Sequence, residues 1–132
     1  MTIVVGYLMS DEGRAALDRA MQEAKLRDAR LVVAHSLRGG PRDEQEQARA
    51  YRDELERIER KLQAEPITSE VRELVRGRPA GEDLVGVATD EGAELLVIGL
   101  RRRNPVGKLA LASNARDVLL HARCPVLAVK AE

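Results

Sequence analysis

The sequence has a single cysteine, Cys124, no Trp or Phe, and only two tyrosines. One cysteine excludes an intramolecular disulfide. So few aromatic rings exclude the stacking surfaces on which proteins bind single-stranded nucleic acids. Lysine plus arginine equals aspartate plus glutamate at 22 each, so the net positive charge typical of DNA- and RNA-binding proteins is missing too. We therefore expect no nucleic-acid partner.

Long apolar runs are also missing. A membrane-spanning helix needs about 20 predominantly apolar residues, and every apolar run here is far shorter. The first six residues carry no positive charge ahead of their apolar stretch, unlike a secretory signal. Together with the single cysteine, these features predict a cytoplasmic protein that does not associate with a membrane.

Short β-branched, apolar runs recur along the 132 residues and predict buried strands of a parallel sheet. A fifth run is mixed with polar residues, which favours a strand near an edge. This length fits one domain over residues 1–132 with a single core. The four buried strands are expected at 3–6, 31–34, 95–98 and 126–129, and the edge strand at 67–75.

Helical spacing of apolar residues falls between these runs. Ser10 marks a helix start and Arg27 the approximate end of that helix. Strands alternating with helices predict an α/β fold, namely a five-stranded parallel doubly wound (Rossmann-like) sheet with about four helices on its two faces. The other helices are expected from the apolar sets Ala48, Tyr51, Leu55, Ile58 and Leu62; Leu84, Val87 and Ala88; and, after the N-cap Ser113, Ala115, Val118, Leu119 and Ala122.

Ligands of doubly wound sheets bind outside the carboxyl ends of the strands, at the point where the strand order reverses. This rule directs attention to the loops after Gly6, Ala34 and Gly99. Glycine at a strand end allows a phosphate to approach the backbone, and it is also ordinary turn chemistry. His35 and Cys124 have no partner at metal or catalytic spacing in the sequence, so we interpret both as structural.

Several segments carry a more specific pattern. Residues 97–99, 101–109, 112–113 and 118–129 resemble the closing third of the universal stress protein family. Residues 3–6, 10, 14–17 and 29–35 resemble the opening strand, helix and second strand of the same family. The resemblance covers almost the whole chain, and it implies a small stress-response protein that is not an enzyme.

The family's nucleotide motif is only partly present. ATP-binding members carry a Gly-x2-Gly-x9-Gly-(Ser/Thr) motif and an aspartate just after the first strand. Gly99 and Ser113 match this motif, whereas Arg102 and Ala112 replace its second and third glycines, and Leu8 replaces the aspartate. A side chain at a position that needs glycine costs about 1 kcal/mol or more, so the motif is degenerate.

The same loop is nevertheless rich in positive charge. Arg101, Arg102, Arg103 and Lys108 precede Ser113 at a helix start, a setting that can hold an anion through guanidinium groups and backbone N–H groups. A solvent-exposed loop is the alternative interpretation of this arginine run. The expected ligand-binding residues are Gly6, Tyr7, Leu8, Ser36, Gly99, Arg101, Arg102, Ser113 and Asn114.

Two hypotheses follow from the resemblance. In the first, the protein is a non-catalytic sensor of an adenine nucleotide, ATP with Mg²⁺, or of another phosphorylated ligand. In the second, the nucleotide site is vestigial and the protein is a homodimeric interaction module paired through its last strand, at Val126, Leu127, Ala128, Val129 and Lys130. A slow ATP hydrolase is a minor third hypothesis, because no base or carboxylate pair adjoins the loop.

Overall fold

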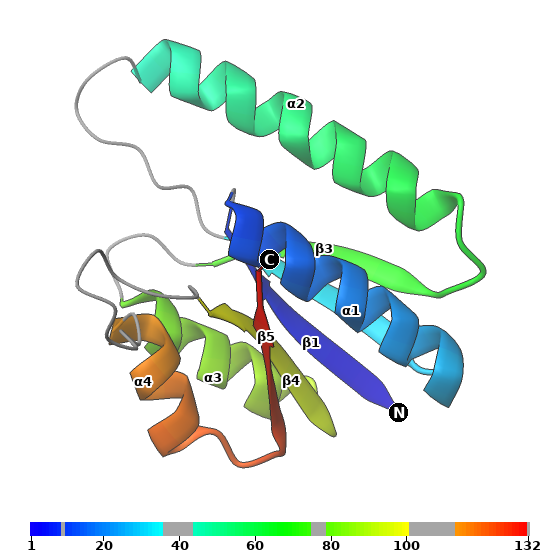
Figure 1. The fold of residues 1–132 in the computed structure, drawn as a ribbon, viewed down its shortest axis with the longest axis vertical. Helices are drawn as coiled ribbons and strands as arrows, with labels where there is room; N and C mark the ends of the chain where they lie inside the picture. The colour runs from blue at the N-terminus through cyan, green and yellow to red at the C-terminus, as the bar shows by residue number, and fades with distance from the viewer. Residues whose placement is uncertain (9, 36–43, 75–78, 101–112, 132) are drawn as a thin grey trace.

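The computed structural model describes residues 1–8, 10–35, 44–74, 79–100 and 113–131, with backbone only at 44–48, 80, 113 and 114. Strands and helices alternate through these residues, as predicted (Figure 1). Their order is β1 (Thr2–Tyr7), α1 (Asp11–Arg27), β2 (Arg30–His35), α2 (Glu44–Gln63), β3 (Ser69–Glu73), α3 (Ala80–Asp90), β4 (Leu95–Leu100), α4 (Ser113–His121) and β5 (Val126–Lys130).

The five strands form one parallel sheet in the order β3-β2-β1-β4-β5. Helices α1 and α2 cover one face, while α3 and α4 cover the other (Figure 1). The predicted doubly wound α/β sheet is therefore confirmed. The polar run at 67–75 forms β3 at the edge of the sheet, as its composition predicted, although the strand itself spans only Ser69–Glu73.

The alternation of side chains along β1 divides the core into two clusters. Ile3, Val5 and Tyr7 face α1 and α2, whereas Val4 faces α3 and α4. All four are at most 2% exposed. Because both faces of this central strand are covered, its sequence is continuously apolar rather than alternating.

Helix α1 is fixed at both ends by local interactions. The Oγ of Ser10 accepts a hydrogen bond from the backbone N–H of Gly13 at 3.1 Å, which confirms the predicted helix start. Asp28 ends the helix in the left-handed conformation, and its N–H bonds to carbonyls of the last turn. These two caps fix where α1 begins and ends, and the helix between them packs along β1 and β4.

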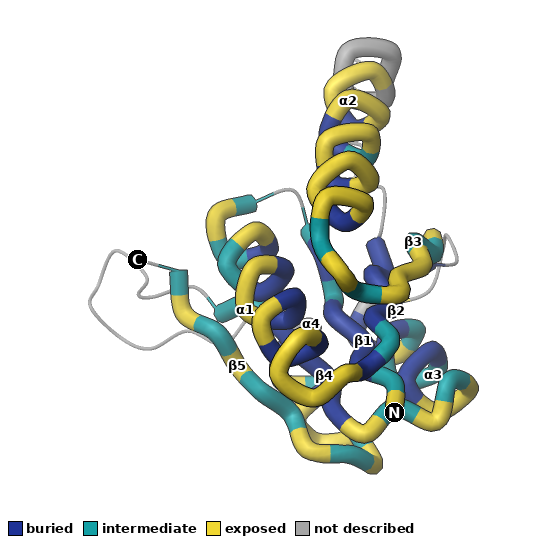
Figure 2. The backbone as a smooth tube through the Cα atoms, turned by 90° about the vertical axis from the view of Figure 1, so that its right-hand side faces the viewer, coloured by how far each residue is buried: buried dark blue, intermediate teal, exposed yellow. Residues whose placement is uncertain are grey.

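Helix α2 packs through one narrow stripe, and most of its surface is exposed (Figure 2). Tyr51, Ile58 and Leu62 are buried and Leu55 is partly buried, as the spacing predicted. Two ion pairs join this region to α1: Lys61 of α2 pairs with Asp18, and Glu65, two residues after α2, pairs with Lys25. The helix is therefore held by a thin apolar seam with charged pairs beside it.

The prediction for α4 is wrong at one position. Ala115 and Val118 are buried against α3 as expected, but Leu119 is 45% exposed. Successive helical residues are rotated by about 100°, and the contact face of this short helix is narrower than its apolar stripe. Leu119 and the neighbouring Leu120 consequently face solvent.

Candidate functional site

The strand order reverses between β1 and β4, which are adjacent in the sheet although α1, β2, α2, β3 and α3 separate them in sequence. The helix after β1 covers one face and the helix after β4 covers the other (Figure 1). Doubly wound sheets bind ligands at such a reversal, outside the carboxyl ends of the two strands, and we call this region the crevice. Gly6 and Gly99, near the ends of β1 and β4, lie beside this reversal, and Ala34 lies near the end of the neighbouring strand β2.

Four predicted site residues lie at the carboxyl ends of β1 and β4: Gly6, Tyr7, Leu8 and Gly99. The backbone of Ser113 and Asn114 forms the start of α4. Ser36, Arg101 and Arg102, together with Arg103, Lys108 and Ala112, lie outside the described residues. The structure therefore brings together the part of the predicted site that β1 and β4 provide.

Both glycines lie in close contact with protein atoms of the neighbouring helices. A Cβ at Gly99 would lie 2.2 Å from the backbone oxygen of Glu12, in the first turn of α1. A Cβ at Gly6 would lie 2.6 Å from a methyl carbon of Leu84 on α3. The contact at Gly99 is with backbone and cannot relax easily, whereas the contact at Gly6 is with the end of a side chain. Both glycines let helices approach the strand ends that border the crevice.

The turn from β1 into α1 is compact. The N–H of Ser10 donates to the backbone oxygen of Leu8 at 2.8 Å, and the N–H of Arg14 donates to the backbone oxygen of Ser10 at 3.0 Å. Asp11 and Glu12 place two acidic side chains in the first turn of α1. This helix start is therefore unfavourable for a phosphate group.

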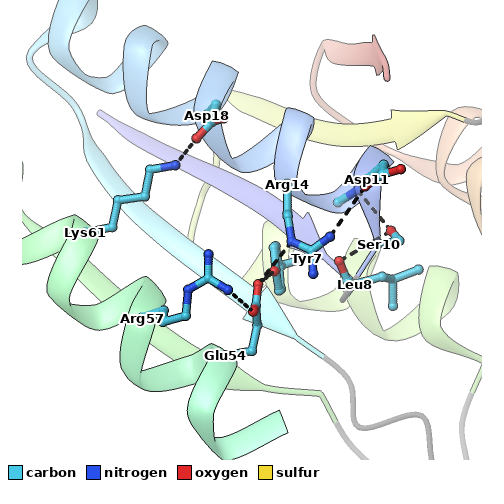
Figure 3. A network of polar contacts seen from close by, with 10 residues as sticks. Tyr7, Leu8, Ser10, Asp11, Arg14, Asp18, Glu54, Arg57 and Lys61 are labelled. Atoms are coloured by element: carbon cyan, nitrogen blue, oxygen red, sulfur yellow. Dashed lines mark hydrogen bonds and ion pairs between the residues drawn. The ribbon is translucent and has the colours of Figure 1, made fainter. Parts of the chain in front are cut away.

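The side chain of Tyr7 points away from the crevice toward α2 (Figure 3). Its hydroxyl donates a hydrogen bond to the Glu54 carboxylate, which also accepts from Arg14 and Arg57, each at 3.3 Å. The Tyr7 bond, followed by the charges of the two arginines, holds the pKa of Glu54 below its usual value. Burial, reinforced by Glu54, raises the pKa of Tyr7. The backbone of Tyr7 remains at the crevice.

Glu54 and Arg14 were missed by sequence reasoning. Glu54 lies three residues after Tyr51, on the same side of α2 as its apolar stripe, and it is 7% exposed. A charged residue inside such a stripe is the signal that could have identified it, because buried carboxylates require partners. The partner, 47 residues away, could not be identified from the local sequence.

His35 and Cys124 have structural environments. The ring of His35 is buried, its Nδ1 is hydrogen bonded with the hydroxyl of Tyr51, and the two ring centroids are 5.4 Å apart. Burial lowers the pKa of His35, and the negative charge of Glu73 partly offsets this decrease. Burial raises the pKa of the Cys124 thiol, which opposes thiolate formation.

The burial of His35 predicts a loss of stability at mildly acidic pH. In the folded protein its pKa is below the ordinary value of 6.5, so the unfolded chain binds this proton more readily. The contribution is complete above pH 6.5 and is lost as the pH falls, with a slope of at most about 1.4 kcal/mol per pH unit. The free energy of unfolding, measured with urea at several pH values, should fall less steeply with decreasing pH for His35→Asn than for the wild type. Parallel curves would contradict this prediction.

The described residues contain no group of three or more His, Cys, Asp or Glu side chains that could hold a metal ion. None of the helices in these ranges combines the length and the apolar character needed to cross a membrane.

Comparison with known proteins shows the family. A profile described as the universal stress protein family matches residues 1–130. A universal stress protein of Mycolicibacterium smegmatis is 45% identical over 129 residues, covering 97% of this chain and 96% of that protein. The structure of a universal stress protein from Archaeoglobus fulgidus is 38% identical with a TM-score of 0.82, and each chain is covered to 98%.

A second structure of a universal stress protein from Archaeoglobus fulgidus was determined in complex with dAMP. That protein is 34% identical to this chain, with 98% of each chain covered and a TM-score of 0.73. The strand order, the two helical layers, the profile match and these relatives agree, and the chain belongs to the universal stress protein family.

Proposed function

We propose that the protein is a non-catalytic, cytoplasmic stress-response protein that binds an adenine nucleotide, or another phosphorylated ligand, in the crevice between β1 and β4. The observation that carries this proposal is the reversal of strand order between these two strands, with α1 and α4 on opposite faces. The dAMP complex of a relative with 34% identity supports the adenine nucleotide as the ligand class.

The charges of the two helix starts suggest the orientation of the ligand. The first turn of α1 contains Asp11 and Glu12, whereas the first turn of α4 contains no acidic residue. Three arginines precede α4 in the sequence, at 101–103. A phosphate is stabilised at a helix N-terminus by backbone N–H groups and the helix dipole. The phosphates would therefore bind beside α4, and the nucleoside would lie along the end of β1.

Leu8 defines the weakest part of this site. It is half-buried directly after β1 and stands where ATP-binding relatives carry an aspartate. An apolar side chain contributes contact area but accepts no hydrogen bond from a ribose or a base. The affinity of the site would therefore depend on the phosphate end and on the three arginines that precede α4 in the sequence.

Calorimetric titration with ATP and Mg²⁺ tests the proposal. We expect binding with a Kd in the range of about 1–100 μM, weakened by Arg101→Ala and unchanged by Arg123→Ala. Arg123 is an exposed arginine that precedes β5, at the amino ends of the strands and therefore away from the proposed site. It serves as the matched control. No phosphate release is expected. An inert wild type beside a Leu8→Asp/Arg102→Gly variant that binds would establish a vestigial site instead.

We also propose a homodimer formed through β5, because this strand lies at the edge of the sheet and pairs with β4 on one side only. The oxygen of Pro125 and the N–H of Ala131 bond to β4. Along a strand, successive residues point their backbone N–H and C=O groups alternately toward one neighbouring strand and toward the other side. Residues 125 and 131 point toward β4, so Val126, Ala128 and Lys130 point their backbone groups toward the free edge of the sheet. An unpaired edge of this kind can pair with a second copy.

Substitution of Ala128 tests the dimer. Ala128→Pro removes an outward N–H and no bond to β4, so we expect light scattering to report a dimer for the wild type and a monomer for this variant. Ala128→Ser retains the N–H at the same exposed position and should remain dimeric. A monomeric wild type, or a dimeric Ala128→Pro variant, would rule out pairing through β5.

A further inference from the structure

We propose that α2 is coupled to the ligand crevice by four side chains, Tyr7, His35, Tyr51 and Glu54, which we call the α2 latch. Nucleotide binding would tighten this latch and hold α2 more firmly against the sheet. The inference rests on the proposed nucleotide-binding function and concerns the regulation of that site.

The latch joins the ends of two adjacent strands to one turn of α2. Tyr7 and His35 are register partners and the last residues of β1 and β2. Glu54 of α2 accepts a hydrogen bond from Tyr7, and the hydroxyl of Tyr51 of α2 is hydrogen bonded with His35. Both tyrosines of a sequence without Phe or Trp are therefore part of this interface.

Two elements that border the crevice meet at Glu54 (Figure 3). Tyr7 is the last residue of β1, directly before Leu8. Arg14 extends from the first turns of α1, with its Nε 3.3 Å from the Glu54 carboxylate. Hydrogen bonds weaken steeply when their distance and angle depart from the optimum. A ligand that orders the end of β1 and the start of α1 therefore also fixes two of the three donors to Glu54.

The packing of α2 is unequal along its length. Ile58 and Leu62, toward its C-terminus, are at most 3% exposed in the core. On the N-terminal side of the latch, the described residues Arg49 and Ala50 are exposed (Figure 2). Opening the polar latch would therefore release the N-terminal half of α2 while the apolar half stays packed. The proposal thus gives α2 two arrangements, the held one that the structure shows and a released one in which the polar contacts are open.

Coupling of this kind is reciprocal. If the nucleotide binds better when the latch is closed, then loosening the latch lowers the fraction of binding-competent protein and raises the apparent Kd by the same factor. Glu54 and Tyr51 lie on α2 and are not among the expected ligand contacts. A change in Kd caused by their substitution would thus report coupling.

The test uses the full-length protein with 3-fluorotyrosine in place of tyrosine. The two tyrosines give two ¹⁹F resonances, assigned with Tyr7→Phe and Tyr51→Phe, and ATP with Mg²⁺ is the titrant. We expect the Tyr51 resonance to shift along the same curve as the calorimetric binding. We also expect Glu54→Gln to raise the Kd at least about fivefold. Asp53→Asn removes a carboxylate from the neighbouring exposed position and should leave the Kd unchanged.

The outcomes separate this inference from the function on which it rests. Calorimetric binding with an unmoved Tyr51 resonance, or with equal Kd values for the wild type and Glu54→Gln, would overturn the latch and leave nucleotide binding intact. Absence of calorimetric binding would overturn both. If Glu54→Gln does not fold by circular dichroism, the Kd of Tyr51→Phe replaces it, and an unchanged value would again overturn the coupling.

Discussion

Gly13→Ala is expected to destabilise the protein by about 3 kcal/mol. A Cβ at this position would lie 1.8 Å from the backbone oxygen of Leu8, and two further backbone atoms of Leu8 lie within 2.9 Å. No side-chain rotation relieves such contacts, because the obstructing atoms are backbone. The turn between β1 and α1 would have to move, and with it the border of the crevice.

Gly86 provides the matched control for this experiment. It also lies in a helix, α3, but a Cβ there would meet nothing within 4 Å. Alanine at a helical position with free space stabilises a protein by about 0.4–1 kcal/mol, chiefly by restricting the unfolded chain. Urea unfolding followed by circular dichroism should therefore give midpoints that move in opposite directions for the two variants. Equal shifts would show that the close approach of Leu8 to α1 is incorrect.

The sequence was sufficient to predict the architecture because local patterns determine it. The β-branched runs and the helical spacing identified all five strands and four helices of the described chain. The polar residues in 67–75 identified the edge strand. Alternation of strands with helices then limits the sheet to a parallel, right-handed arrangement, and the point of strand reversal follows from that fold.

Individual side chains were harder to predict, because their contacts are not local. Tyr7 was expected to line the crevice, since it follows Gly6 at the strand end. The alternation along β1 turns its side chain toward α2, where it bonds with a residue 47 positions later. For Gly99 the sequence indicated either the approach of a phosphate or an ordinary turn, whereas in the structure the first turn of α1 occupies the space beside it. Packing partners of this kind become visible only in three dimensions.

The buried carboxylate on α2 gives the second large expected effect: Glu54→Ala should lower the free energy of unfolding by about 2 kcal/mol. Three partners lose their acceptor, but they do not contribute equally. The side chains of Arg14 and Arg57 are 45% and 67% exposed, so water replaces the carboxylate and each pair contributes about 0–1 kcal/mol. The hydroxyl of Tyr7 is buried and would be left without an acceptor, which is the larger cost.

This reasoning predicts a change of sign in a double-mutant cycle. Tyr7→Phe in the wild type should cost about 1 kcal/mol, because it removes one donor from a carboxylate that keeps two arginines. In the Glu54→Ala background the same substitution removes an unsatisfied hydroxyl and should restore about 1 kcal/mol. Glu59→Ala, at an exposed position of the same helix, should change stability by less than about 0.5 kcal/mol. Additive effects of Tyr7→Phe and Glu54→Ala in urea unfolding would show that the two side chains do not interact, and that α2 is held to β1 by its apolar stripe alone.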